Sequence, residues 1–172
     1  MVEKYCKDSF VVKTSLVFPP DTNSHGTLFG GKLMAYIDDV AAISAMRHAR
    51  KHIVTASSDS VDFLHPIQEG NSVCLESFVT YTGTSSMEVF VRVIAENLLT
   101  GERNICALSF LTMVAVDENG KPVEVPKVIP QTEEEKELYQ SAKDRAEFRK
   151  KRKKRSEEFA RKFGTGLPWS KL

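Results

Sequence analysis

The sequence predicts an α+β domain in which one long central helix is wrapped by an antiparallel sheet of five to six strands. Three features of the sequence support this. A single long amphipathic helical pattern covers about residues 31–50, one strand-like segment precedes it, and four strand-like segments follow it. The links between the later segments are short and rich in turn residues, which favours antiparallel pairing of consecutive strands. The predicted order is therefore strand, long helix, four strands.

The first strand and the helix are each marked by their residue types. Residues 9–18 are mostly β-branched or aromatic and end at a proline pair, as a strand does. In residues 31–50, Leu33, Ile37 and Val40 recur at spacings of three and four, the period of a helix with one buried face. Basic residues in the last turn suit the negative end of the helix dipole.

The remaining strands alternate apolar and polar residues, as Val73, Leu75 and Val79 do with their neighbours. They are predicted over residues 53–63, 72–82, 87–98 and 104–116. One helix cannot cover both faces of a five-stranded sheet. We therefore expect the sheet to wrap around the helix and its open side to pair with a second copy of the chain.

A change of composition near residues 128–130 predicts two parts, a domain at 1–130 and a charged helical extension at 131–172. The net charge of +1 combines −4 in the first part with +5 in the second. Thr132 and Glu135 match a capping box, which marks a helix start, and the helix that follows is charged on all sides. The run from Arg149 to Arg155 is entirely basic. It predicts either a solvated or frayed helix end or a contact with an anion, such as a polyphosphate ligand or a nucleic acid.

Several classes of protein are excluded by composition and motifs. No apolar run reaches the ~18 residues of a membrane span, and the first residues lack a signal-peptide pattern. Three cysteines without a CxxC pair favour reduced thiols and a cytoplasmic location. The four histidines have no ligand spacing, and no Walker loop, GxGxxG or GxSxG motif occurs. We therefore expect neither a metal nor a cofactor.

The residues best suited to catalysis or binding lie at the start of the long helix and in its middle. Gly30 and Gly31 leave the backbone N–H groups of the first helical turn open to an anion or a carbonyl, although a plain turn also uses glycine. Adjacent helical residues point about 100° apart, so Asp38 shares a face with Gly31 while Asp39 does not. A carboxylate on an inward or inter-subunit face is costly unless it is paired or functional. On spacing alone, both aspartates could equally face solvent or form salt bridges.

The segment Asp21-Thr22-Asn23-Ser24-His25-Gly26-Thr27-Leu28-Phe29-Gly30-Gly31, followed by Ile37-Asp38-Asp39-Val40-Ala41, resembles the signature of hotdog-fold acyl-CoA thioesterases. The most similar branch contains the brain-type cytosolic acyl-CoA hydrolases and their bacterial relatives. The combination is specific: Asn-x-x-Gly-x-x-x-Gly-Gly, with an acid seven residues after the last glycine. Matching segments continue at 53–57, 62–67, 84–89 and 130–136, so the resemblance covers about residues 10–150.

The resemblance implies a hotdog fold and an active site between two subunits of a homo-oligomer, often a trimer of dimers, that is, a homohexamer. Asn23 would orient the water or the thioester, and Asp38 would be the general base or the nucleophile. The backbone N–H groups of Gly30 and Gly31 would polarise the thioester carbonyl. One base, one orienting amide and one oxyanion site are sufficient for acyl transfer to water.

The resemblance also implies contacts with the substrate. Phe29 stands where many relatives carry His and would line the thioester end of the channel, so it bears on acyl preference. Ser85, Ser86 and Met87 resemble the segment that contacts the CoA arm. The predicted function is an acyl-CoA thioester hydrolase that releases a free fatty acid and CoA. It would use no cofactor, because CoA is part of the substrate, and its partners would be acyl-CoA and other copies of the chain, not nucleic acid.

Two alternatives stay open at this point. One is a hotdog module that binds acyl-CoA, or through its basic tail a nucleic acid, without turnover. The other is a hotdog dehydratase acting on a β-hydroxyacyl thioester, which pairs a histidine with an acid; His25 is the nearby candidate. The combination of Asn23 and Asp38 favours the hydrolase, because a mere binder has no reason to place an acid beside a carbonyl.

Overall fold

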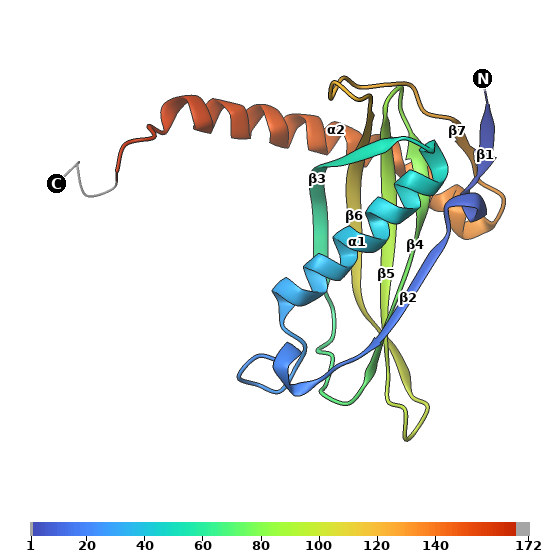
Figure 1. Ribbon diagram of the computed structural model, residues 1–172, viewed down its shortest axis with the longest axis vertical. Coiled ribbons are helices and arrows are strands. Elements are labelled where there is room, and N and C mark those ends of the chain that lie inside the picture. The colour runs from blue at the N-terminus through green and yellow to red at the C-terminus, as the bar shows by residue number, and fades with distance from the viewer. Residues whose placement is uncertain (1, 168–172) are drawn as a thin grey trace.

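The structure is a computed structural model and describes residues 2–167; Met1 and residues 168–172, the end of the predicted extension, lie outside the described residues. Along the chain the elements are β1 (Glu3–Tyr5), η1 (Cys6–Ser9), β2 (Val11–Leu16), η2 (Pro19–Asp21), α1 (Gly30–Ala49), β3 (His52–Phe63), β4 (Ser72–Thr82), β5 (Ser86–Glu96), β6 (Arg103–Val116), β7 (Lys127–Ile129) and α2 (Glu133–Lys162) (Figure 1).

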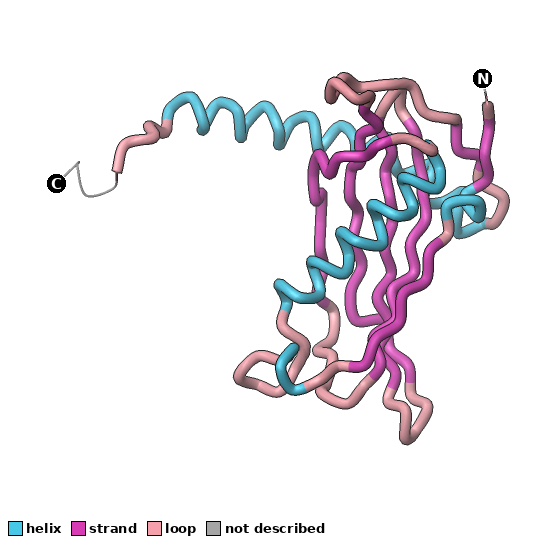
Figure 2. The backbone as a smooth tube through the Cα atoms, in the orientation of Figure 1, coloured by secondary structure: helices cyan, strands magenta, loops and turns pink. Residues whose placement is uncertain are grey.

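Five strands form one antiparallel sheet in the order β2-β4-β5-β6-β3, so that β2 and β3 are its edges (Figure 2). This confirms the predicted α+β architecture, with five strands rather than six. The first strand starts two residues later than predicted, because Cys6–Ser9 form a 3-10 turn ahead of it. The short parallel pair β1–β7, which joins the N-terminal strand to the segment before α2, was not predicted.

One face of the sheet is covered by α1, and the predicted helical stripe is the buried one. Ile37, Val40 and Ala41 are 0–1% exposed and belong to the same core as Val73 and Leu75 of β4. The helix is also fixed to β4 by polar contacts: Ser77 Oγ lies 2.7 Å from Ser44 Oγ and donates to the carbonyl oxygen of Val40 at 3.0 Å. The opposite side of α1 stays open.

The other face of the sheet is crossed by the first half of α2, which corrects the expectation of a helix charged on all sides (Figure 1). Ala142 is fully buried, and Leu138 and Tyr139 pack against the core. The Tyr139 ring lies 5.4 Å from that of Tyr81 on β4. Arg145 donates to Glu88, a buried carboxylate on β5, at 2.8 Å. The apolar residues Leu138, Tyr139 and Ala142 are few and stand among charged residues, so the sequence did not indicate a buried side of this helix.

The basic run is also only partly solvated, because two of its residues are bound to the edge strand β3. Arg149 Nη1 lies 3.0 Å from Asp59 Oδ2, and Arg152 Nη2 lies 2.6 Å from Asp59 Oδ1. The expectation of a solvated or frayed end is therefore wrong for Arg149, whereas Arg152 is paired but remains 47% exposed. Beyond Arg152, α2 continues past the β3 edge as an exposed helix (Figure 1). Neither helix of the described chain is long and apolar enough to cross a membrane.

Candidate functional site

The loop before α1 is organised by Asn23. Its Oδ1 accepts hydrogen bonds from the backbone N–H groups of His25 (2.9 Å) and Thr27 (3.3 Å), and its Nδ2 donates to Thr27 Oγ1 (3.0 Å). Asparagine commonly closes a turn in this way. Gly26, with φ of 70°, supplies the left-handed residue that the turn requires. In the single chain, Asn23 thus has a structural role in shaping the loop at the start of α1.

The first turn of α1 lies open at the end of this loop. Phe29 is the N-cap residue and makes no capping hydrogen bond through its side chain, so the first N–H groups of the helix lack a side-chain acceptor. The Phe29 ring folds back over Gly31: a Cβ atom at Gly31 would lie 2.5 Å from the ring. Glycine at this position therefore lets the half-exposed Phe29 side chain lie against the helix start.

A pocket of about 400 Å³ adjoins this helix start and contains two of the predicted site residues, Asn23 and Gly30. Its other walls come from the segment that follows β3. The lining residues are Asn23, Thr27, Leu28, Gly30, Leu33, Phe63, Leu64, His65, Pro66 and Ile67. The pocket therefore combines an amide side chain, a helix N-terminus and apolar walls.

Asp38 lies outside this pocket, on the open side of α1. Its side chain is exposed and accepts a hydrogen bond from Thr55 Oγ1 of β3 at 2.8 Å. Asp39 points elsewhere and forms a salt bridge with Lys13 of β2 at 2.8 Å. The two adjacent carboxylates are thus distinguished by their neighbours: Asp39 is paired with a cation, whereas Asp38 is held by a hydroxyl group beside the free edge strand.

The structure brings some of the predicted site residues together and keeps others apart. Eight residues separate Gly30 from Asp38, which is about 12 Å along a helix. Ser85 and Ser86 lie at the opposite end of the sheet from Gly30, since Ser86 pairs with Val114 next to the end of α1. Met87 is fully buried in the core. Asn23 and Gly30 share one pocket within one chain, whereas Asp38 and the serines do not line it.

The cysteine thiols are not activated, and the described residues contain no cluster of metal-binding side chains. All three cysteines are free, and burial raises the pKa of the Cys6 thiol to about 12. Burial also raises the pKa of Cys106. Neither thiol is therefore set up as a nucleophile at neutral pH. Within residues 2–167, no group of three or more His, Cys, Asp or Glu side chains is placed to hold a metal ion.

Two residues at the site are not marked by the sequence. Thr55 lies in a segment that matches the family, but a threonine in a strand is ordinary and nothing in the sequence connects it with Asp38. His65 lines the pocket beside Asn23, and its backbone N–H donates to Cys106 O at 3.2 Å. The His65-Pro66 turn suggested only a loop.

Comparison with known proteins shows to which family the chain belongs. Residues 25–102 match the family model described as "Thioesterase superfamily". The chain is 64% identical to an uncharacterized acyl-CoA thioester hydrolase of Bacillus subtilis (strain 168), over 96% of both chains. It is 38% identical to the cytosolic acyl coenzyme A thioester hydrolase of Rattus norvegicus, over 76% of this chain but only 35% of that longer protein.

The solved structures similar to this chain are also acyl-CoA thioesterases and hydrolases. A structure described as an apo-hexameric acyl-CoA thioesterase superposes with a TM-score of 0.87 at 58% identity, covering 88% of this chain and 97% of that one. An acyl-CoA hydrolase from Staphylococcus aureus, in complex with butyryl-CoA, CoA and CoA disulfide, gives 0.89 at 46% identity, covering 92% and 97%. Structures of that enzyme also exist with an asparagine, an aspartate or a threonine replaced by alanine. The chain therefore belongs to the thioesterase superfamily and has its hotdog fold.

Proposed function

We propose that this protein hydrolyses acyl-CoA thioesters to a free fatty acid and CoA, at sites built from two copies of the chain. The observation that carries this proposal is the trio Asn23, Asp38 and Thr55. Their spacings of 15 and 17 residues equal those of the asparagine, aspartate and threonine replaced in the Staphylococcus aureus acyl-CoA hydrolase. In this chain Thr55 holds Asp38, and Asn23 shapes the loop at the open helix start.

A second copy is needed because the parts lie apart in one chain. The pocket at Asn23 and Gly30 contains no acid, and Asp38 lies on the open side of α1. Around Asp38 that side carries exposed apolar residues, Met34, Ile43 and Met46, with Val54 on the free edge strand β3. A contiguous exposed apolar surface marks an interaction site. We propose that the second copy packs there and brings its own Asn23 and helix start to this Asp38.

The assembly that follows is a homo-oligomer with a dimer as its unit. The hexameric relatives support a trimer of such dimers. Residues 1–130 would carry the chemistry, and in the extension at 131–172 the first half of α2 would brace the outer face of the sheet. The three free cysteines and the cytosolic relatives support a cytoplasmic location.

In the proposed reaction, Asp38 acts as the general base. Its carboxylate takes a proton from a water molecule whose oxygen attacks the thioester carbonyl carbon. The backbone N–H groups of Gly30 and Gly31 stabilise the oxyanion of the tetrahedral intermediate, because they point at the place where negative charge develops. When the C–S bond breaks, the CoA thiolate takes the proton back from Asp38. Thr55 orients the carboxylate, Asn23 positions the water or the thioester, and no cofactor takes part in these steps.

Other residues would contact the substrate. Phe29, folded over Gly31, would border the thioester end of the channel and limit the acyl group there. Ser85 and Ser86 would contact the CoA arm at the far end of the sheet. Met87 would support that strand from the core, since its side chain has no exposed surface.

Thiol release from acyl-CoA substrates of graded chain length tests the activity. Asp38→Asn keeps the shape of the side chain and removes the proton acceptor, so kcat should fall by about two to four orders of magnitude. Asp39→Asn is the matched control, because Asp39 pairs with Lys13 away from Thr55, and its kcat should stay near that of the native enzyme. Native turnover in Asp38→Asn would refute the assignment.

Mixed oligomers test whether the site is shared. Subunits with Asn23→Ala and subunits with Asp38→Asn are each expected to be inactive or nearly so. In verified mixed oligomers some sites regain both native residues, and activity returns only if the two residues come from different chains. Absence of any recovery would place both residues in one chain's site.

A further inference from the structure

The edge strand β3 has more residues than the part of β6 with which it pairs. Its twelve residues lie opposite ten residues of β6. The two extra residues fall between Thr55 and Ser57 and between Ser58 and Ser60, where the pairing slips. Side chains of a regular strand alternate between the two faces of the sheet, and each extra residue reverses this alternation for the residues that follow. The two bulges therefore decide which side chains of β3 face α1 and which face α2.

The first bulge controls the direction of the Thr55 side chain. In a regular strand Thr55 and Ser57 would face the same side of the sheet. Instead, Thr55 Oγ1 donates to Asp38 on α1, whereas Ser57 Oγ accepts a hydrogen bond from Arg152 on α2 at 2.7 Å. An extra residue placed before Thr55 instead of after it would turn the Thr55 hydroxyl group away from Asp38. The position of this bulge thus decides whether the proposed base keeps its hydrogen bond.

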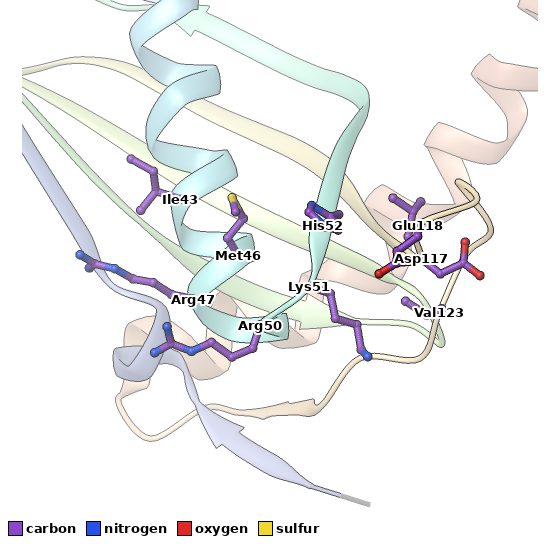
Figure 3. Close-up of a pocket in the computed structure, with 10 residues that line it drawn as sticks. Ile43, Met46, Arg47, Arg50, Lys51, His52, Asp117, Glu118 and Val123 are labelled. Carbon is purple, nitrogen blue, oxygen red and sulfur yellow. The ribbon is translucent and has the colours of Figure 1, made fainter.

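The ends of β3 fix the number of extra residues but not their positions along the strand. At its start, β3 follows α1 after the two-residue link Arg50-Lys51, which Figure 3 shows leading into His52. At its far end, the backbone N–H of Leu64 donates to Cys106 O at 2.8 Å. Both ends can stay as they are while an extra residue moves along the strand. The positions of the bulges must therefore be fixed by contacts between the two ends.

Such contacts are made by a polar cluster on the α2 side of the sheet. The Asp59 cluster consists of Ser57, Asp59, Thr112, Arg149 and Arg152. Besides its ion pairs with the two arginines, the Asp59 carboxylate accepts hydrogen bonds from Ser57 and from Thr112 of β6. Arg152 also donates to the carbonyl oxygen of Asp59 at 2.6 Å, and so binds the backbone of the second bulge itself. Because charge-assisted hydrogen bonds are the stronger ones, the cluster favours this one placement of the bulges.

We infer that Asp59 is a positioning residue for the proposed hydrolysis. Together with the two arginines of α2 it holds the bulges in place, which keeps Thr55 turned toward Asp38. The inference rests on the proposed function, in which Thr55 orients the carboxylate of the base. Asp59 lies on the opposite face of the sheet from Asp38, so it acts through the strand and does not touch the substrate. The anion that the basic run of the sequence binds is then a carboxylate of its own chain.

Asp59→Asn keeps the size of the side chain and removes the charge that binds both arginines. For an acyl-CoA, kcat should fall about three- to tenfold with KM unchanged, because the effect passes only through the Thr55 hydroxyl group. Glu88→Gln is the matched control. It breaks the other ion pair between α2 and a buried carboxylate of the sheet, that of Arg145, but lies on β5 and leaves the bulges in place. Its kcat should equal that of the native protein even if its Tm falls as far.

A double-mutant cycle separates positioning from general destabilisation. In a Thr55→Val background, Asp59→Asn should lower kcat no further, since the group that it positions is gone. A milder variant serves if Asp59→Asn folds poorly. Arg152→Gln removes contacts with both bulges from a side chain that is 47% exposed, so it should fold and lower kcat about twofold. Lys154→Gln, at an exposed position of the same run, should leave kcat unchanged.

Three outcomes would overturn the inference and leave the hydrolase function standing. They are native kcat in both Asp59→Asn and Arg152→Gln, an equal loss in Glu88→Gln, and the same loss with and without the Thr55 hydroxyl group. Hydrogen–deuterium exchange adds a measurement without turnover: residues 53–58 should exchange faster in Asp59→Asn than in Glu88→Gln. If the native protein hydrolyses no acyl-CoA, the proposed function fails. Equal exchange in the two variants would then show that Asp59 does not hold the bulges.

Discussion

Replacing Asp59 should detach α2 from the edge of the sheet. The Asp59 side chain is 9% exposed and receives hydrogen bonds from Ser57 (2.6 Å), Thr112 (2.7 Å), Arg149 (3.0 Å) and Arg152 (2.6 Å). Burial alone would raise the pKa of Asp59, but these hydrogen bonds and the charge of Arg149 hold it below its usual value. The charged form is therefore stabilised by the fold, and this stability is lost as the pH falls through the lowered pKa.

The expected cost of Asp59→Asn is about 2 kcal/mol. Breaking a fully buried ion pair costs about 3–5 kcal/mol, whereas an exposed pair contributes at most about 1 kcal/mol. The Arg149 side chain is 20% exposed and that of Arg152 is 47% exposed, so the first pair counts between the two limits and the second near the exposed one. At about 2–4 °C per kcal/mol for a chain of this size, Tm should fall by about 4–8 °C.

Two measurements check this. Calorimetry at fixed protein concentration gives Tm, and limited trypsin digestion gives the accessibility of the basic run, which should be cleaved faster in Asp59→Asn. Lys154→Ala, in the same run but exposed and without a partner on the body, is the control. A Tm within about 1 °C of native, with unchanged cleavage, would show that the arginine contacts with Asp59 do not hold α2.

Three further outcomes are expected. Thr55→Val, which removes the hydrogen bond to Asp38, should lower kcat about tenfold; a kcat equal to that of the native protein would exclude an orienting role. Gly31→Ala should displace the Phe29 ring, since its Cβ would lie 2.5 Å away, and change the ratio of kcat/KM between short and long acyl chains; the same ratio in both proteins would count against Phe29 as a wall. Burial lowers the pKa of His48, so as the pH falls below about 6.5 the histidine of the unfolded chain binds a proton before that of the folded chain. The free energy of unfolding, measured by urea denaturation, should therefore drop between about pH 7.5 and 5.5 in the native protein and drop less in His48→Gln.

Most of the fold was predictable because its signals are local. The α1 stripe and the alternation along β4 each arise from burial on one side of one element, and the bounds of the five predicted strands agree with the structure within two residues. The contribution of α2 to the sheet was not predictable in this way. Only Leu138, Tyr139 and Ala142 mark its buried side, and the rest of its contact surface is made of charges whose partners lie on strands far away in the sequence.

The candidate site, too, was predictable only where its signals are local. The helical period placed Asp38 and Asp39 on different sides of α1, and the structure gives them different partners, Thr55 and Lys13. Neither partner could be named from the sequence, since each depends on which strand lies beside the helix. In the proposed site, Asn23 and Asp38 meet only through a second copy, which no pattern within one chain can locate.

The two irregularities in β3 have a consequence for the behaviour of the chain at high concentration. The pairing of β3 with β6 slips between Thr55 and Ser57 and again between Ser58 and Ser60. Such bulges increase the local twist and interrupt the regular row of backbone groups that an edge strand would offer. A strand of this shape accepts a neighbour only where the two backbones match and cannot act as a template for fibril growth. We therefore expect concentrated protein to stop at closed assemblies and to give no thioflavin-positive fibres, whereas straightening β3 by deleting Ala56 and Asp59 should permit them.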